Sequence, residues 1–193
     1  MDLMQSKPDN YYDLAIVDPP YGIDVNKMNM GGRSFKPTAK SWDFEIPDST
    51  YFNELLRVSK NCVVWGGNYF TEHLPASQYF SIWDKGETMY GRDFAECEYA
   101  WVRSGGTRIY KKNPNQQNRI HPTQKPVKLY EWLLMNYAKE GDKILDTHGG
   151  SGSICLACHN LGFSLDWIEL DEDYYQSACK RYDRHIRQLR MFQ

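Results

Sequence analysis

Short apolar runs alternate along the chain with longer stretches in which apolar residues recur every three or four positions. The short runs predict six strands, over residues 12–17, 62–65, 78–84, 96–102, 143–146 and 164–170. The longer spacing predicts four helices, over residues 49–60, from 126 to before Gly141, 151–161 and 172–189. Strands that alternate with helices are typical of a mostly parallel sheet covered on both faces. We therefore predict an α/β fold with a doubly wound, mostly parallel sheet.

Two connections between these elements are long and polar. Residues 22–48 are rich in Gly, Asn, Lys and Pro, and residues 103–119 form a second polar stretch that contains Gly and Asn. Neither stretch shows the periodicity of a helix or a strand. A loop as long as residues 22–48 is usually either functional or mobile.

The composition indicates one folded unit. The chain has 193 residues, of which 41% are hydrophobic and 25% are charged, and we interpret residues 1–193 as a single domain. No apolar run approaches the roughly 18 residues that span a bilayer, and the N-terminal residues lack the apolar segment of an export signal. Five cysteines, an odd number spread along the chain, fit a reducing compartment. We expect a soluble cytoplasmic protein that contacts no membrane.

Charge is unevenly distributed, although the net charge is only −2. Residues 25–42 and residues 99–130 contain basic side chains and no acid. Such a separation can place a positive face opposite phosphates, and the alternative is two solvated loops whose charges bind nothing specific. The basic residues are Lys27, Arg33, Lys36 and Lys40 in the first window and Arg103, Arg108, Lys111, Lys112, Arg119, Lys125 and Lys128 in the second.

The segment Asp146-Thr147-His148-Gly149-Gly150-Ser151-Gly152-Ser153 lies between a predicted strand and a predicted helix. Glycines at such a place let a ligand approach the backbone, and the N-terminus of a helix favours an anion. Glu169 follows Gly150 by 19 residues, the spacing at which a carboxylate can accept both ribose hydroxyls in a doubly wound sheet. Cys155 stands where a dinucleotide fingerprint requires a third glycine, which disfavours a nicotinamide or flavin. The alternative is an ordinary strand-to-helix connection.

The tetrapeptide Asp18-Pro19-Pro20-Tyr21 follows the first predicted strand. An exocyclic amine of a nucleobase is a poor nucleophile, so its catalyst must favour pyramidal nitrogen and stabilise the developing positive charge. The Asp18 carboxylate can accept one N–H and a carbonyl of the two prolines the other. Tyr21 can stack on a base that has left the duplex. The alternative is an ordinary turn that ends a strand.

Together these residues resemble the amino-methyltransferases that act on DNA bases with S-adenosylmethionine, in the permuted group where DPPY precedes the Gly-rich motif. The segment His121-Pro122-Thr123-Gln124-Lys125-Pro126 is similar to the family's HPTQKP segment, and Trp65 to Tyr69 and Trp83 to Lys85 resemble segments behind the target-base pocket. The resemblance implies a Rossmann-like methyltransferase fold in circularly permuted order. It also implies double-stranded DNA as partner, no metal, and a bacterial or phage-encoded enzyme of restriction–modification type.

The resemblance assigns roles residue by residue. It implies that Asp18, Pro19, Pro20 and Tyr21 are catalytic. It implies that the cofactor is bound by Asp18, Thr123, Gln124, Lys125, Asp146, His148, Gly150, Ser151, Gly152 and Glu169. Lys125 either pairs with the cofactor carboxylate or is a solvated side chain. The family's usual Pro and aromatic residue in the Gly-rich loop are Thr147 and His148 here.

The region available for reading DNA sequence is short, at about residues 103–119. We expect either a short or relaxed recognition site, or a homodimer whose second subunit supplies further DNA contacts. The residues that we expect to contact DNA are Lys27, Arg33, Lys36, Lys40, Arg103, Arg108, Lys111, Lys112 and Arg119.

The same residues leave three alternatives to an adenine-N6 methyltransferase. Cytosine-N4 transfer presents the same chemical problem, but in the resembling families Ser more often opens the cytosine motif, so Asp18 favours adenine. A catalytically silent DNA-binding subunit would have no need of an intact DPPY. The Cys155-x-x-Cys158-His159 sequence spells a haem-attachment motif, but it lies inside a predicted helix of a chain without an export signal, and no second cysteine pair completes a zinc site.

Overall fold

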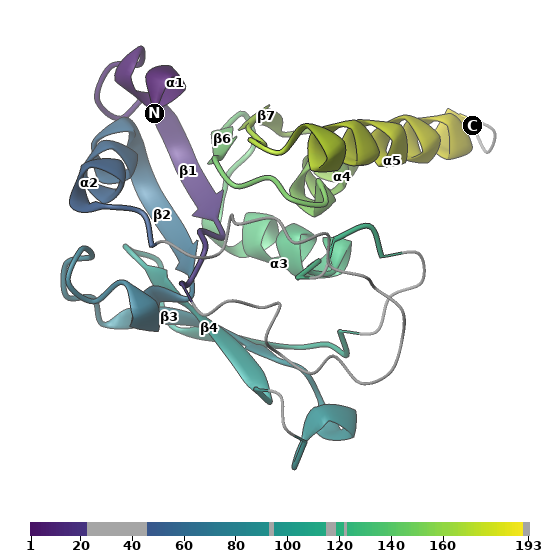
Figure 1. The fold of residues 1–193 in the computed structure, drawn as a ribbon, viewed down its shortest axis with the longest axis horizontal. Coiled ribbons are helices and arrows are strands. Elements are labelled where there is room, and N and C mark those ends of the chain that lie inside the picture. The colour runs from purple at the N-terminus through teal and green to yellow at the C-terminus, as the bar shows by residue number, and fades with distance from the viewer. Residues whose placement is uncertain (23–45, 93–94, 115–118, 122, 191–193) are drawn as a thin grey trace.

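The computed structural model describes residues 1–22, 46–92, 95–114, 119–121 and 123–190. Their centre is a seven-stranded sheet in the order β5-β3-β4-β2-β1-β6-β7 (Figure 1). Of these strands β4 runs antiparallel to both of its neighbours, and every other pair is parallel, which confirms the mostly parallel sheet. The strands are β1 (Tyr12–Val17), β2 (Ser59–Trp65), β3 (Tyr79–Asp84), β4 (Cys97–Val102), β5 (Arg108–Lys111), β6 (Lys143–Asp146) and β7 (Ser164–Trp167).

Helices cover both faces of this sheet. At the start of α2, the Asp48 carboxylate accepts a hydrogen bond from the Tyr51 backbone N–H at 3.1 Å, an N-cap that satisfies one otherwise unpaired donor. Figure 1 shows the longest helix, α5, running past α4 toward the C-terminus. The helices are α1 (Asp2–Gln5), α2 (Ser49–Val58), α3 (Val127–Tyr137), α4 (Ser153–Leu161) and α5 (Glu172–Arg190), with short 3₁₀ helices η3 (Gly67–Tyr69) and η4 (Glu87–Met89).

Alternate residues of the central strands pack into two separate cores. On one face Leu14 and Ile16 of β1 are buried in a cluster with α3 and α4. On the other face Ala15 and Val17 are buried in a cluster with α2. Because successive strand residues point to opposite faces, the uninterrupted apolar run of β1 fills both cores at once. This two-faced burial confirms the doubly wound arrangement.

The prediction of an irregular polar connection over residues 103–119 was wrong in part, because residues 108–111 form strand β5. This strand pairs in parallel with the edge of β3, and three of its four residues are exposed, with Ile109 65% exposed. Backbone hydrogen bonds therefore hold β5 in place without a buried apolar face, and the sequence carries no period-2 pattern to reveal it. The short helix α1 was likewise not predicted, and the strand expected over 164–170 ends at Trp167.

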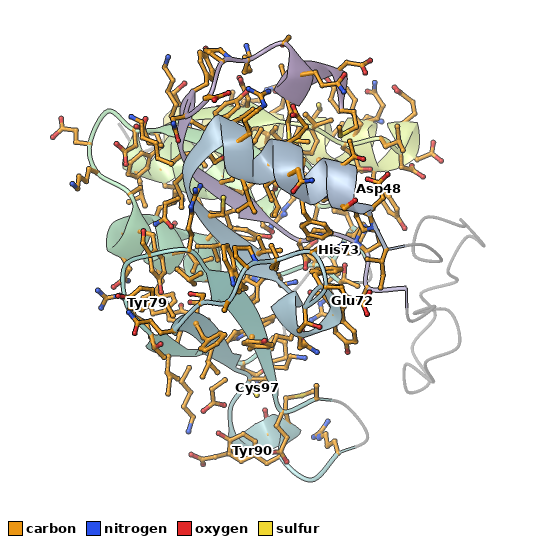
Figure 2. The ribbon with its side chains drawn as sticks, turned by 90° about the vertical axis from the view of Figure 1, so that its left-hand side faces the viewer. Asp48, Glu72, His73, Tyr79, Tyr90 and Cys97 are labelled. Atoms are coloured by element: carbon orange, nitrogen blue, oxygen red, sulfur yellow. The ribbon has the colours of Figure 1, made fainter. Side chains whose placement is uncertain are left out.

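The connection between β3 and β4 projects from the body of the protein. Figure 2 shows Tyr90 at its tip and Cys97 where β4 begins. Asp84 organises the base of this projection, because its carboxylate accepts hydrogen bonds from the Gly86 backbone N–H and the Tyr90 hydroxyl, both at 2.8 Å. Among the residues described, no helix combines the length and apolarity that crossing a bilayer would require.

Candidate active site

The predicted motifs converge where the chain changes faces of the sheet. β1 leads to α2 on one face, whereas its neighbour β6 leads to α4 on the other. The carboxyl ends of two such strands form a topological switch point, the usual ligand crevice of an open α/β sheet. Asp18 follows β1 and Asp146 ends β6, so the DPPY segment and the Gly-rich loop start side by side.

Asp18 is held from two directions. One carboxylate oxygen accepts a hydrogen bond from the Tyr21 hydroxyl at 2.6 Å, and the other accepts from the ammonium of Lys125. The Tyr21 ring stacks on Tyr69, with ring centroids 4.9 Å apart and planes inclined by 12°. Gly66 has a φ of +68°, and a Cβ there would lie 2.3 Å from the Tyr21 ring, so glycine is required beside this side chain. Asp18 therefore has a fixed orientation.

Lys125 belongs to a chain of alternating charges. Its side chain is only 3% exposed, and besides Asp18 it contacts the Glu98 carboxylate at 3.2 Å. The other oxygen of Glu98 accepts from Lys85 at 2.9 Å. The Lys125 ammonium also lies 5.2 Å from the centre of the Trp65 ring, whose face attracts a cation. Lys85, Glu98, Lys125 and Asp18 thus form a continuous ion-pair network beneath the DPPY segment.

Mutual attraction sets the ionisation of this network. Burial alone would lower the pKa of Lys125, but the carboxylates of Asp18 and Glu98 outweigh it and raise that pKa above its usual value. Burial alone would raise the pKa of Glu98, but the Lys125 and Lys85 ammonium groups hold that pKa below its usual value. Burial and the nearby Asp18 carboxylate raise the pKa of the Tyr21 hydroxyl well above its usual value. Lys125 and Glu98 are therefore charged, and Tyr21 is a neutral donor.

Glycines shape the loop between β6 and α4. A Cβ at Gly149 would lie 1.9 Å from the Trp167 side chain, and Gly152 has a φ of +66°, so both positions require glycine. The Gly150 backbone N–H donates to the Glu169 carboxylate at 2.6 Å. The second oxygen of Glu169 accepts from the Asp171 backbone N–H at 2.8 Å. The predicted ribose-binding acid therefore points at the Gly-rich loop, with lone pairs left for further hydrogen bonds.

Asp146 is a buried carboxylate in this loop, 2% exposed. Burial raises its pKa to about 8, helped by the negative charges of Asp18 and Glu169 and opposed by a hydrogen bond from the His148 backbone N–H. Like charges that face one site favour a positively charged ligand there. Asp146 is therefore mostly protonated near pH 7, and its carboxyl group lies beside the negative charges of Asp18 and Glu169 at the switch point.

His148 takes the place of the family's usual aromatic residue and packs as an aromatic. Its ring meets Tyr51 of α2 edge to face, with centroids 5.2 Å apart. The Tyr51 hydroxyl and Thr147 hydroxyl lie 2.7 Å apart and close a small polar cluster with the His148 ring. Burial lowers the pKa of His148 to about 4, so the ring is neutral near pH 7.

The segment that precedes α3 reaches the Gly-rich loop through its backbone. The Lys125 carbonyl accepts a hydrogen bond from the Ser153 hydroxyl at 2.8 Å. The His121 ring faces Gly150, because a Cβ placed on Gly150 would lie 3.8 Å from that ring. Gln124 is buried and accepts from the Ile120 backbone N–H at 3.1 Å, while the Thr123 hydroxyl lies 3.0 Å from the His121 ring nitrogen. The structure therefore brings this segment and Ser151 to Ser153 together. The Lys125 ammonium itself forms an ion pair with Asp18.

Several site residues were not expected from the sequence. The Arg181 guanidinium of α5 donates to the Ser151 carbonyl at 2.8 Å and to the Ser153 hydroxyl at 2.9 Å. Glu98 and Lys85 complete the ion-pair network from β4 and the end of β3. Lys85 ends the Trp83 to Lys85 segment named in the resemblance, although no role was assigned to it. No sequence motif distinguishes Glu98 and Arg181 from ordinary surface charges, because their partners lie far away along the chain.

The basic residues expected to contact DNA do not share one surface. Lys112 is exposed after the end of β5, at the sheet edge that carries Asp84. Lys111 pairs with Glu87 at 2.9 Å beside it. Arg103 instead donates to the Leu56 and Ser59 carbonyls, where β2 begins, at the opposite edge from Asp18.

The remaining expected DNA contacts fall elsewhere. Arg119 is exposed and donates to the Pro114 carbonyl at 2.7 Å, and the Arg108 guanidinium lies 6.0 Å from the centre of the Tyr137 ring of α3. Four expected contacts, Lys27, Arg33, Lys36 and Lys40, lie outside the described residues. In the part of the chain that is described, no three His, Cys, Asp or Glu side chains are grouped to hold a metal ion.

More than half of the sequence matches a known protein family. A family model described as DNA methylase, N6_N4_Mtase, matches residues 76–180, more than half of the chain. The chain belongs to this N6/N4 DNA methylase family. Among relatives, the type II methyltransferase M.HpaI of Haemophilus parainfluenzae is 38% identical over 69 residues, which is 36% of this chain and 22% of M.HpaI. The match thus spans about a fifth of the length of that relative.

Solved structures of methyltransferases share the fold of this DNA methylase. The M1.HpyAVI–SAM complex superposes with a TM-score of 0.60 at 20% identity, covering 93% of this chain and 91% of the other. The cytosine-N4-specific PvuII DNA methyltransferase superposes with a TM-score of 0.59 at 13% identity, covering 93% and 82%. The predicted Rossmann-like methyltransferase fold is thereby confirmed.

Proposed function

We propose that this DNA methylase transfers a methyl group from S-adenosylmethionine to the N6 amine of an adenine in double-stranded DNA. The observation that carries the proposal is the fixed Asp18 carboxylate at the switch point, beside the Gly-rich loop. A conjugated amine needs an acceptor that is already oriented, because free energy spent on orientation during the reaction would raise the barrier. Tyr21 and Lys125 provide that orientation.

The residues of the loop fit S-adenosylmethionine. The negative charges of Asp18 and Glu169 face a site that opens onto the Gly150 backbone, and the protonated Asp146 adds a carboxyl group beside them, which suits a ligand with hydroxyl groups and positive charge. Glu169 would accept from the ribose hydroxyls, and Asp146 with the loop 148–152 would face the methionine half. When bound, the donor supplies a methyl group on a sulfonium sulfur, so a nitrogen–carbon bond forms as the carbon–sulfur bond breaks and one amine proton is then lost to solvent.

The chain's own contribution is to bind and orient the amine. Asp18 accepts one N–H of the amine and stabilises the positive charge that develops on nitrogen. The stacked pair of Tyr21 and Tyr69 lies next to Asp18, and Tyr69 is 42% exposed. We expect the flipped base to stack on this aromatic pair, since a base must leave the duplex before its amine can be reached.

Adenine is favoured over cytosine by the residue that opens the motif. Asp18 stands where cytosine-N4 enzymes of the resembling families more often have Ser. The fold itself supports neither base, because a cytosine-N4-specific enzyme shares it. Cytosine-N4 transfer is therefore the second candidate, distinguished by the modified base alone.

We propose that DNA approaches the side of the sheet where the parallel strands have their carboxyl ends. Lys111, Lys112 and Arg119 follow or end β5 on the side of Glu98, within the region of about 103–119 that we assign to target recognition. This region is short in the sequence, so we propose few base contacts or a second subunit that completes them.

Analysis of the modified nucleoside tests this function. Purified protein is incubated with unmethylated double-stranded DNA and S-adenosylmethionine carrying an isotopically labelled methyl group, and the DNA is digested and separated by mass spectrometry. The proposal predicts label in N6-methyldeoxyadenosine. Label in N4-methyldeoxycytidine would establish the second candidate, and DNA binding without any label would establish a silent subunit.

A further inference from the structure

The Asp18 carboxylate is not the only charge next to the proposed binding site of the target amine. Its partner Lys125 is buried and carries a full positive charge next to it. An ammonium in contact with a carboxylate cancels most of the field that the carboxylate projects, so the pair of Asp18 and Lys125 would attract a developing positive charge only weakly. A second negative group is needed to restore the attraction.

Glu98 is placed to supply that group. One of its oxygens lies 3.2 Å from the Lys125 ammonium, on a strand separated in sequence from both Asp18 and Lys125. Lys85 holds the other oxygen of Glu98 at 2.9 Å and ends the network on that side. Lys85 therefore fixes Glu98 from the side away from Asp18, where its own charge acts at greater distance. Arg119 is a further cation that acts on Glu98.

On the basis of the proposed function, we infer that Glu98 is a positioning residue for methyl transfer, which neutralises Lys125 and fixes it so that Asp18 keeps both its orientation and its attraction for the amine nitrogen. Glu98 acts through Lys125 and donates nothing to the substrate. The network Lys85–Glu98–Lys125–Asp18 is thus a support for the reaction as well as for the fold.

The charge of Glu98 can be removed with little change in its shape. Glu98→Gln is expected to lower kcat at saturating DNA and donor by at least about tenfold, because an electrostatic contribution in the transition state is lost. The dissociation constant for S-adenosylmethionine is expected to change less than about twofold, since Glu98 is not in the Gly-rich loop. Glu98→Asp keeps the charge and is expected to recover kcat to within about threefold of the unmodified protein.

A matched control is Glu54→Gln, which removes a carboxylate from an ion pair with Arg57 on α2, away from the site. This control is expected to leave kcat unchanged. If Glu98→Gln and Glu54→Gln have the same kcat as the unmodified protein, the inference about Glu98 is overturned while the proposed function stands. An unmodified protein that transfers no methyl group would instead overturn the proposed function.

A second comparison decides the matter even if Glu98→Gln alone does not fold. Lys125→Met and the double variant Lys125→Met with Glu98→Gln are compared, because removing both members of a buried ion pair leaves no uncompensated charge from that pair. Since Glu98 acts through Lys125, the second substitution is expected to lower kcat no further. A further tenfold loss in the double variant would show that Glu98 acts independently of Lys125, and would overturn the inference.

Discussion

The ammonium of Lys125 donates to the carboxylate of Asp18, although the two residues lie 107 positions apart in the chain. This contact ties the segment before α3 to the carboxyl end of β1. It also excludes the alternative that Lys125 is a solvated side chain, because its side chain is 3% exposed and its ammonium contacts Asp18 and Glu98, while its contact with the cofactor stays a prediction. The orientation of the proposed catalytic carboxylate therefore depends on a remote segment.

Replacing His148 should change how stability depends on pH. Burial lowers the pKa of His148 to about 4 from an ordinary value of 6.5. The unfolded chain therefore takes up a proton between pH 6.5 and 4 that the folded chain does not, so folding stability falls as pH falls through this window. His148→Phe keeps an aromatic ring against Tyr51. As the pH falls from 7.5 to 5, its free energy of unfolding should rise by about 2 kcal/mol relative to that of the unmodified protein. Urea denaturation at the two pH values measures this difference, and an equal difference at both would refute the assignment.

The raised pKa of Asp146 predicts the opposite dependence of folding stability on pH. Its folded pKa is raised to about 8 from 3.8, so the folded chain holds a proton that the unfolded chain has already lost. Without ligand, stability should therefore fall as pH rises from 5 to 8. Relative to Asp146→Asn, which has no carboxyl group to ionise, the free energy of unfolding of the unmodified protein should fall by about 3.5 kcal/mol over this range. Parallel pH profiles for the two proteins would show that Asp146 ionises normally.

Arg181 should support donor binding from outside the Gly-rich loop. Its guanidinium donates to the Ser151 carbonyl and the Ser153 hydroxyl, which fixes the loop at the start of α4. Arg181→Met should weaken S-adenosylmethionine binding roughly threefold to tenfold, the effect of losing one or two hydrogen bonds to a charged group. Calorimetric titration measures this, with Arg184→Met as the control, since Arg184 lies exposed on the same helix. Equal donor affinity in both variants would exclude the loop-holding role.

Salt dependence should separate the basic residues that contact DNA from those that hold the fold. Lys112 lies at the edge of the sheet proposed to face DNA, whereas Arg103 caps backbone carbonyls at the opposite edge. The slope of log affinity against log salt should become shallower by about one on Lys112→Ala and should not change on Arg103→Met. Fluorescence anisotropy with a short duplex over a range of salt concentrations gives these slopes. A change in slope for Arg103→Met alone would place DNA on the opposite edge.

The sequence predicts the local features of the fold well. The apolar run of β1, the Gly-rich loop after β6 and the amphipathic spacing of α2 each depend on neighbouring residues, so their patterns are visible in the chain. The edge strand β5 escaped prediction because backbone pairing with β3 holds it and most of its side chains are exposed.

The site was predictable only in part, for the same physical reason. DPPY and the Gly-rich loop are contiguous segments and could be recognised. Glu98 and Arg181 act through partners that folding alone brings near, and a single Glu or Arg on a strand or helix is usually a solvated charge. Tyr21 was expected to meet the base directly, whereas in the structure its ring also stacks on Tyr69.

The central claim is that the Asp18 carboxylate activates the amine, and Asp18→Asn tests it most directly. This variant keeps the shape of the side chain but removes its charge and one acceptor, so it should lower the rate of methyl transfer to DNA on the order of 10²- to 10³-fold. Binding of S-adenosylmethionine should remain, because the Gly-rich loop and Glu169 are intact. Single-turnover transfer of a labelled methyl group, measured with donor affinity on the same preparations, gives both quantities. A rate for Asp18→Asn equal to that of the unmodified protein would contradict the mechanism.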